Sequence, residues 1–338
     1  MRFDDIVIAS LASVEAPHRV STAELEGRLA PHLSKLGLLP GTLEALSGIA
    51  ARRFFDGGTA PSQAAAAAGR RALGQADIGP ERVGLLINTS VCRDFVEPST
   101  ACLVHQQLGL PSDCLNFDLS NACLGFLNGM ALASRMLERG DVEYALVVDG
   151  ESARYVVEKT LERLMAPDAN PQTFRDNLAT LTLGSGAAAA VLTRLSNAPH
   201  AHKLVGVVSR TASEHNHLCR GQNDWMTTDA TGLLSAGVEL GVRTWEAAQS
   251  ELGWRDGALD VAVLHQVSKV HTESIARRLG LSLDRVPVIY PEHGNVGPAS
   301  VPMTLAHAAR TGLATRGARI GLMGIGSGLN CAMAEVVW

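Results

Sequence analysis

A cysteine, a histidine and an asparagine stand where they could form and stabilise a covalent intermediate. Cys123 lies in the stretch SNACLGFLNGM, after a predicted strand and just ahead of a predicted helix. A thiol at the N-terminus of a helix feels the helix dipole, which lowers its pKa and enlarges its thiolate fraction. The alternative is a small buried apolar residue, which describes most free cysteines. Cys123 is therefore a candidate nucleophile that needs support from other residues.

His265 and Asn295 are the candidates for that support. His265 ends the apolar run DVAVLHQ, and Asn295 lies in the turn EHGNVGP between Gly294 and Gly297. Each also has an ordinary explanation, since a histidine here can be a hydrogen-bonded core residue and asparagine serves turns by itself. The other five cysteines show no paired spacing of the kind that binds zinc, so a metal is not expected.

Two further motif matches point elsewhere, and we reject both. The stretch GIGSGLN (324–330) looks like a dinucleotide loop, but such a loop opens a helix, whereas a strand-like segment follows here. A glycine-rich turn between two strands instead lets backbone N–H groups approach a ligand, as an oxyanion hole requires. The order Cys, His, Asn, with 142 residues from Cys123 to His265, also fits a papain-like protease. The local cysteine signature of that family is absent, and the alternating strand–helix pattern is wrong for it.

The elements that must position these residues alternate between strands and helices. Short apolar runs bounded by turn residues predict strands over 6–9, 83–88, 115–118, 145–149, 187–192, 261–265, 286–289 and 319–324, with a last strand at the C-terminus. Helical periodicity predicts helices over 64–73, 100–108, 126–139, 233–252, 272–279 and 301–309. This alternation is typical of βαβ units and mostly parallel sheets.

The two halves of this pattern resemble each other. Landmarks beginning at residues 84, 108, 116 and 145 have counterparts beginning at 262, 279, 288 and 320, so the offset stays between 171 and 178 residues. Such self-similarity indicates a duplication, with the polar break 196–203 separating domains 1–195 and 196–338. Ligands of open α/β sheets bind beyond the carboxyl ends of the strands. The residues there are Asn88 and His265 in one equivalent pair, and Cys123 and Asn295 in the other.

Composition limits the classes of protein that the chain can belong to. Its 338 residues are 46% hydrophobic, which excludes a disordered chain. The formal charge of −5 shows no basic stripe, so nucleic acid is not an expected partner. The N-terminus lacks the basic start and long apolar core of a signal peptide, and no stretch reaches the roughly 20 apolar residues of a membrane span. We therefore expect a cytoplasmic protein with reduced thiols.

Five stretches together resemble the thiolase superfamily, in its ketosynthase III branch. They are EPSTACLVHQQLGL (97–110), NFDLSNACLGFLNGM (116–130), VLHQVS (263–268), EHGNVGPASVP (292–302) and GIGSGLN (324–330), spread over the whole chain. The loop RDFVEPSTA and the C-terminus are most similar to the acyl-CoA condensing enzymes of bacterial long-chain olefin biosynthesis. The resemblance implies a thiolase fold, in which two pseudo-symmetric βα halves form a five-layer αβαβα sandwich.

The resemblance also implies a reaction and a role for each residue. Cys123 would accept the acyl group of one fatty acyl-CoA, while the backbone N–H groups of Cys123 and Ser327 form the oxyanion hole. His265 and Asn295 would stabilise the enolate of the second acyl-CoA. Glu97 would be the base that removes the α-proton, reaching in from the other subunit of a homodimer. Burial in an acyl channel would raise the pKa of Glu97 and make it a stronger base.

The implied product is a 2-alkyl-3-ketoacid or its CoA ester, for enzymes that make an olefin, a ketone or a β-lactone. Coenzyme A thioesters are substrates, no cofactor is expected, and downstream enzymes of the pathway are possible partners. The alternatives are a decarboxylative ketosynthase III that uses malonyl-thioester and a non-catalytic acyl-binding member of the same superfamily. The chain has no clear equivalent of the aromatic and arginine pair that clamps the adenine of CoA in ketosynthase III enzymes, and Arg52, Arg53, Arg220 and Trp225 are the candidates considered for that role.

Overall fold

Nine strands form the main sheet of this computed structural model, which describes residues 1–255 and 257–338. The strand order is β11-β12-β13-β8-β1-β7-β6-β4-β5. The bounds are β1 (Ile6–Glu15), β4 (Val83–Asn88), β5 (Leu115–Asp118), β6 (Tyr144–Glu151), β7 (Gly186–Arg194), β8 (His202–Thr211), β11 (Val261–Leu264), β12 (Arg319–Gly326) and β13 (Asn330–Val337).

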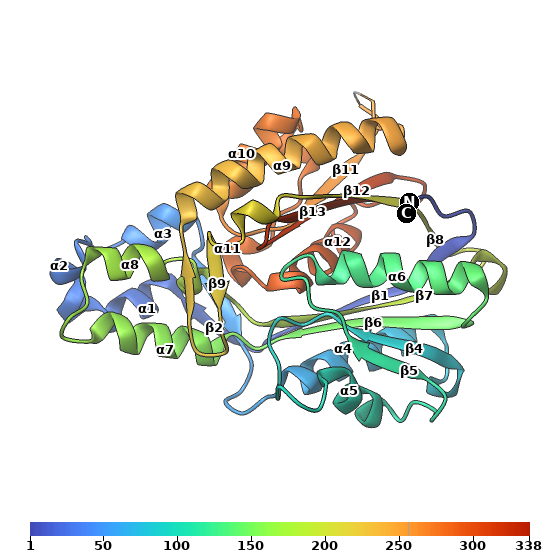
Figure 1. The fold of residues 1–338 in the computed structure, drawn as a ribbon, viewed down its shortest axis with the longest axis horizontal. Coiled ribbons are helices and arrows are strands. Elements are labelled where there is room, and N and C mark those ends of the chain that lie inside the picture. The colour runs from blue at the N-terminus through green and yellow to red at the C-terminus, as the bar shows by residue number, and fades with distance from the viewer. Residues whose placement is uncertain (256) are drawn as a thin grey trace.

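Figure 1 shows the nine strands as two stacked groups, which we call the two ends of the sheet. Helices lie between these two groups and on the outer face of each (Figure 1). The helices α6 (Gly125–Arg139) and α12 (Ser300–Arg310) lie between the β8–β11–β12–β13 end and the β1–β4–β5–β6–β7 end. On the outer faces lie α9 (Ala230–Glu251) and α10 (Lys269–Leu279), and opposite them α4 (Pro61–Ala76) and α5 (Thr100–Leu108). The predicted five-layer αβαβα sandwich is confirmed.

The strand order is mirrored about the pairing of β1 with β8. These two strands meet antiparallel through only two residue pairs, Val7 with Lys203 and Ile8 with His202. Moving outward, one end reads β1-β7-β6-β4-β5 and the other reads β8-β13-β12-β11. Strands β4 and β11, and strands β6 and β12, therefore take equivalent places, as the sequence repeat predicts. The domain boundary between residues 195 and 196 stays a prediction.

The strand predicted over 286–289 is wrong. Val286 is extended but Ile289 is not, and the segment joins no sheet because Pro287 has no N–H to donate. The fully buried side chain of Gln266 takes the place of a neighbouring strand. Its Nε2 donates to the carbonyl of Pro287 at 2.7 Å, and its Oε1 accepts the N–H groups of Ile289 and Tyr290 at 2.7 and 3.0 Å. One amide side chain thus supplies the hydrogen bonds that a neighbouring strand would otherwise make with this segment.

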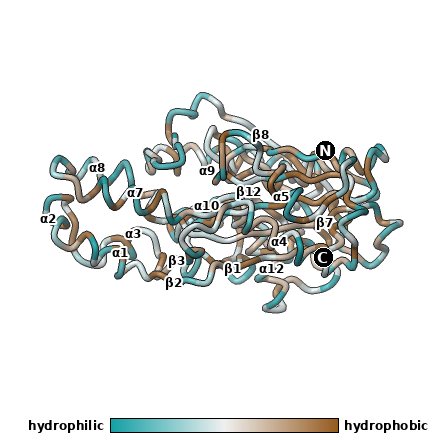
Figure 2. Tube along the Cα trace, turned by 90° about the horizontal axis from the view of Figure 1, so that it is seen from below, coloured by the Kyte–Doolittle hydropathy of each residue, from teal (hydrophilic) through white to brown (hydrophobic). Residues whose placement is uncertain are grey.

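A helical lobe that the sequence reading did not predict protrudes from one end of the sandwich (Figures 1 and 2). It consists of α1 (Thr22–Arg28), α2 (Leu33–Leu36), α3 (Thr42–Ser47), α7 (Arg154–Met165) and α8 (Pro171–Asn177). These helices enclose their own apolar cluster, which includes Leu25, Leu36 and Leu161. Beside the lobe lie the two-stranded sheets β2 (His18–Ser21) with β3 (Ala51–Phe54) and β9 (Cys219–Gly221) with β10 (Met226–Thr228), and a short helix α11 (Tyr290–His293).

Most predicted elements are present with longer or slightly shifted ends. The strands over 83–88 and 115–118 and the helix over 100–108 match to the residue. Strand β1 runs six residues beyond its predicted end at residue 9, and β8 was not predicted. In the part of the chain that the structure describes, no helix combines the length and apolarity needed to cross a membrane.

Candidate active site

Cys123 is held in a tight turn between β5 and α6. Ala122 takes the left-handed conformation, with φ of 45°, which is uncommon for a residue with a side chain. The N–H of Leu124 donates to the carbonyl of Asn121 at 3.0 Å, and the N–H of Gly125 donates to that of Ala122 at 3.1 Å. Helix α6 then begins at Gly125. The turn therefore fixes Cys123 two residues before the first residue of α6, as predicted.

The hairpin between β12 and β13 packs directly on this turn. A Cβ added to Gly326 would lie 3.0 Å from the carbonyl oxygen of Asn121 and 3.2 Å from the nitrogen of Leu124, so any other residue would push the hairpin and the turn apart. Asn330, at the other side of the hairpin, donates from Nδ2 to Oδ1 of Asn121 at 3.0 Å. Ser327 follows Gly326 immediately, so the hairpin brings it beside the Cys123 turn.

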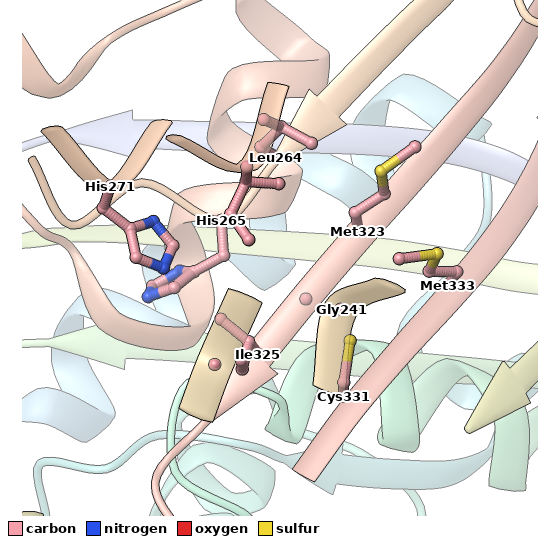
Figure 3. A pocket seen from close by; sticks show the side chains of 11 residues that line it. Gly241, Leu264, His265, His271, Met323, Ile325, Cys331 and Met333 are labelled. Atoms are coloured by element: carbon pink, nitrogen blue, oxygen red, sulfur yellow. The ribbon is translucent and has the colours of Figure 1, made fainter. Parts of the chain in front are cut away.

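His265 extends the ladder of β11 by one residue. Its N–H donates to the carbonyl of Met323 on β12 at 2.7 Å, and the residue is 2% exposed. Together with His271 it lines a small pocket of ≈ 20 Å³ between α9, α10 and β12 (Figure 3). Burial lowers the pKa of His265 to about 3 and that of His271 to about 4, so both imidazoles are neutral at physiological pH. Among the residues that the structure describes, neither Nδ1 has a hydrogen-bond partner. Each neutral imidazole therefore offers one nitrogen that donates a hydrogen bond and one that accepts.

Asn295 is held by its backbone and by one side-chain atom. Its N–H donates to the carbonyl of Thr182 at 2.8 Å, and its own carbonyl accepts the N–H of Gly184 at 2.9 Å. The side-chain Oδ1 accepts the N–H of Gly297 at 3.0 Å. This bond fixes the orientation of the amide and leaves Nδ2 available as a donor. A donor fixed in this way suits an oxygen on which negative charge develops.

Two acidic side chains that the sequence reading missed lie in the same region. Asp149 and Glu151 sit at the end of β6 and are 0% and 5% exposed. Burial raises the pKa of both carboxyls, and the charge of Glu151 raises that of Asp149 further. A Cβ added to Gly297 would lie 3.3 Å from the carboxyl carbon of Glu151, which places this carboxyl against the Asn295 turn. The signal available in the sequence was a pair of acidic residues in an otherwise apolar buried strand.

The pKa of Cys123 moves opposite to the direction predicted from its helix. Burial raises the pKa of the thiol to about 12, and the carboxyls of Glu151 and Asp149 act in the same direction. Burial and neighbouring carboxyls thus outweigh the helix N-terminus. The resting nucleophile is a thiol, and a neighbouring base must take its proton when it attacks.

Glu97 is not buried within its own chain. It lies in the loop between β4 and α5, where it is exposed next to Phe95 and Val96, which are 57% and 88% exposed. Within its own chain Glu97 is therefore exposed, and its burial stays a prediction. The structure places Cys123 after β5, His265 at the end of β11, Ser327 in the turn after β12 and Asn295 in the turn after α11, and leaves Glu97 on the surface.

Of the residues considered for adenine binding, Arg52 is excluded. It is 1% exposed, and its guanidinium donates to Oγ1 of Thr22 at 2.9 Å and to the carbonyl of Leu181 at 2.7 Å. Arg220 is exposed and Trp225 is partly exposed, and both lie on the β9–β10 hairpin or its turn. Among residues 1–255 and 257–338, no group of three or more His, Cys, Asp or Glu side chains could hold a metal ion.

Comparison with known proteins identifies the family. Residues 117–212 match the family model of 3-oxoacyl-[acyl-carrier-protein] synthase III, and residues 250–338 match the model of its C-terminal part. An acyl-CoA:acyl-CoA alkyltransferase of Xanthomonas campestris is 50% identical over 338 residues, which is 100% of both chains. One of Shewanella oneidensis is 37% identical over 351 residues, again covering 100% of both chains.

Solved structures agree with the sequence relatives. A structure of Xanthomonas campestris OleA with bound lauric acid and lauroyl-CoA has a TM-score of 0.97, with 99% of this chain and 100% of that chain covered. Other structures of that enzyme, with TM-scores of 0.97 or 0.98, carry single replacements of a histidine or a glutamate. At 50% identity over essentially the full length, the chain belongs to the acyl-CoA:acyl-CoA alkyltransferase family, in the ketosynthase III-like branch of the thiolase superfamily.

Proposed function

We propose that this enzyme joins two fatty acyl-CoA molecules by a Claisen condensation that needs no decarboxylation. The product is a 2-alkyl-3-ketoacid, the first intermediate toward a long-chain olefin, ketone or β-lactone. The proposal depends on the 50% sequence identity, over the full length of both chains, to an acyl-CoA:acyl-CoA alkyltransferase. The arrangement of the Cys123 turn, the Gly326 hairpin and the Asn295 amide supports it. The enzyme works as a homodimer in the cytoplasm and passes its product to further enzymes of the pathway.

In the first step Cys123 takes the acyl group from one acyl-CoA. The neutral imidazole of His265 accepts the thiol proton while Sγ attacks the thioester carbon. The N–H groups of Cys123 and Ser327 donate to the oxygen that becomes negative. The bond to the CoA sulfur then breaks, and CoA leaves as a thiol with the proton. A thiol with a raised pKa needs such an acceptor, because almost none of it is ionised at neutral pH.

In the second step the α-carbon of another acyl-CoA becomes the nucleophile. Without a malonyl carboxylate to lose, this carbon must give up a proton, and Glu97 of a second subunit removes it. Nδ2 of Asn295 and the imidazole of His265 donate to the enolate oxygen. The carbanion attacks the acyl group on Cys123, a carbon–carbon bond forms, and the thiolate leaves and takes a proton. Hydrolysis of the remaining thioester releases CoA and the ketoacid.

One substrate is enough to test this proposal. We expect the purified enzyme to convert lauroyl-CoA alone into free CoA and a β-keto product that decarboxylates to a ketone, measured by liquid chromatography and mass spectrometry. No turnover until malonyl-thioester is added would refute it. Intact mass after incubation should show one acyl adduct that is absent in Cys123→Ala, and absence of the adduct from the native protein would favour a binding-only role.

The second candidate is a decarboxylative ketosynthase III, which the two matching family models favour. That reaction forms its enolate by losing carbon dioxide and does not need a base at Glu97. Glu97→Gln separates the candidates. We expect it to form the acyl-cysteine and to lose condensation almost completely, whereas a decarboxylative enzyme would keep its activity.

A further inference from the structure

The loop that carries Glu97 is tied down at both ends by a carboxylate that accepts two successive backbone N–H groups. At its start, Oε1 of Glu151 accepts the N–H of Val91 at 2.6 Å, and Oε2 accepts that of Cys92 at 3.3 Å. At its end, Oδ2 of Asp118 accepts the N–H of Thr100 at 2.9 Å and Oδ1 accepts that of Ala101 at 2.8 Å. Carboxylate acceptors of this kind make strong hydrogen bonds.

The middle of the loop has a third attachment, in which the carboxylate belongs to the loop itself. Asp94 accepts both the N–H and the hydroxyl of Ser62, at 3.0 and 2.6 Å, where α4 begins. Beyond Asp94, the next three residues, Phe95, Val96 and Glu97, are all exposed. Glu97 thus lies on the outside of a loop that is anchored at both ends and in the middle. This arrangement is the one that action at a site on another subunit requires.

Glu151 differs from the other two carboxylates because it also touches the reaction centre of its own chain. Its carboxyl carbon packs against Gly297, whose N–H holds Oδ1 of Asn295. It is also one of the carboxyls whose charge acts on Cys123. One buried side chain therefore connects the start of the Glu97 loop with the turn that bears the enolate donor.

We propose that Glu151 is a positioning residue that sets the place of Glu97 for the condensation step, by holding Val91 and Cys92 against the Asn295 turn. The proposal rests on the function proposed above. It predicts that loss of Glu151 slows the second half-reaction far more than the first. Cys123, Ser327 and the Gly326 hairpin make no hydrogen bond with the loop among the described residues, and removing the charge of Glu151 lowers the pKa of Cys123, which does not hinder its attack.

The test is Glu151→Gln, because glutamine keeps the shape but offers only one oxygen. Its NH₂ group then faces a backbone N–H that has lost its acceptor. We expect acyl-enzyme formation, followed by intact mass over time, to stay within about threefold of the native rate, and condensation to fall by at least about tenfold. Asp118→Asn acts at the far end of the loop and should show the same split if Glu151→Gln fails to fold. Equal slowing of both half-reactions, or condensation at the native rate, would overturn the proposal.

Glu26→Gln is the matched control. Glu26 is 7% exposed and its two oxygens likewise accept two backbone N–H groups, those of Gly41 and Leu43, but it lies in the helical lobe. We expect this variant to lose stability without any split between the half-reactions. A split as large as that of Glu151→Gln would show that loss of any such carboxylate produces it, and would overturn the assignment to Glu151.

Mixed dimers then decide whether Glu151 acts through the loop. In a dimer of one Glu151→Gln chain and one Cys123→Ala chain, the intact Cys123 is served by a Glu97 whose own Glu151 is intact. We expect about half of the native condensation activity. If this pair is inactive while Glu97→Gln with Cys123→Ala is active, Glu151 acts at its own Cys123 and the proposal is wrong. If neither pair is active, Glu97 does not act across subunits. The proposal then stands or falls on whether Glu151→Gln slows condensation more than acylation.

Discussion

Gly326→Ala tests whether the hairpin of β12 and β13 sets the geometry around Cys123. The added Cβ would meet the carbonyl oxygen of Asn121 at 3.0 Å, the nitrogen of Leu124 at 3.2 Å and Cβ of Ala122 at 3.3 Å. All three atoms belong to the turn that holds Cys123, and hydrogen bonds at both of its ends prevent it from yielding alone. The hairpin and the turn must therefore separate by a few tenths of an ångström.

That displacement is large for an oxyanion hole built from the N–H groups of Cys123 and Ser327. Loss of one oxyanion donor costs about 100- to 1,000-fold in rate, and a partial displacement should cost about 10- to 100-fold. Overpacking should cost about 1–3 kcal/mol of the free energy of unfolding. Because the hole serves the first half-reaction, we expect the acylation of Cys123 to slow by this factor.

The assay follows the acyl adduct on Cys123 by intact mass after rapid mixing with lauroyl-CoA, and a urea titration gives the stability. Gly74→Ala is the control, because Gly74 lies in α4 with nothing within 4 Å of the added Cβ. It should acylate at the native rate. Acylation of Gly326→Ala within about twofold of native, in a folded protein, would refute the role of the hairpin, since the contact would then have been absorbed without moving a donor.

Three further results are expected. Alkylation of Cys123 by iodoacetamide should accelerate about tenfold per pH unit from pH 7 to 9, because burial raises the pKa of the thiol to about 12. A rate that reaches a plateau below pH 8 would contradict this raised pKa. Gln266→Leu leaves three buried backbone groups without partners and should cost about 3 kcal/mol at about 1 kcal/mol each, read from the urea midpoint; a change below about 1 kcal/mol would show that water replaces the amide. In the folded state Asp149 holds a proton that the unfolded chain releases, and Glu151, with its pKa raised to about 7, holds one until about pH 7 and is a carboxylate above it. The free energy of unfolding should therefore fall as pH rises from 5 to 8, and Asp149→Asn should flatten this slope; an unchanged slope would mean that Asp149 is ionised in the folded protein.

Much of the fold follows from local pattern, and the exceptions have physical causes. Helix α5 was predictable because Ser99 caps its first turn and Gly109 ends it in the left-handed conformation. The segment over 286–289 was apolar enough for a strand, but Pro287 and the side chain of Gln266 decide its pairing, and no pattern reveals a side chain that replaces a strand. Strand β8 was missed because its polar start coincides with the break between the halves.

The candidate site was predictable where residue type and turn geometry coincide. Cys123, Asn295 and the Gly326 hairpin stand at chain positions that periodicity and glycine placement mark out. The pKa of Cys123 was not predictable, because the carboxyls that act on it approach from β6 only when the chain folds. Glu151 was overlooked for the same reason, since a carboxyl at a strand end usually lies in water.

The order in which strands pair has a consequence for how the chain is made. Strand β1 leaves the ribosome first, yet its long partner β7 begins 180 residues further along the chain, at Gly186. Gly186 pairs with Glu15, at the far end of β1. At about 5–20 residues per second this takes roughly 10–40 seconds. During that interval the segment IVIASLASVE has no strand beside it, so the nascent chain must be shielded from aggregation. When β7 arrives it completes the first end of the sheet, and β8, the next strand to emerge, finds Val7 and Ile8 already in place to receive it.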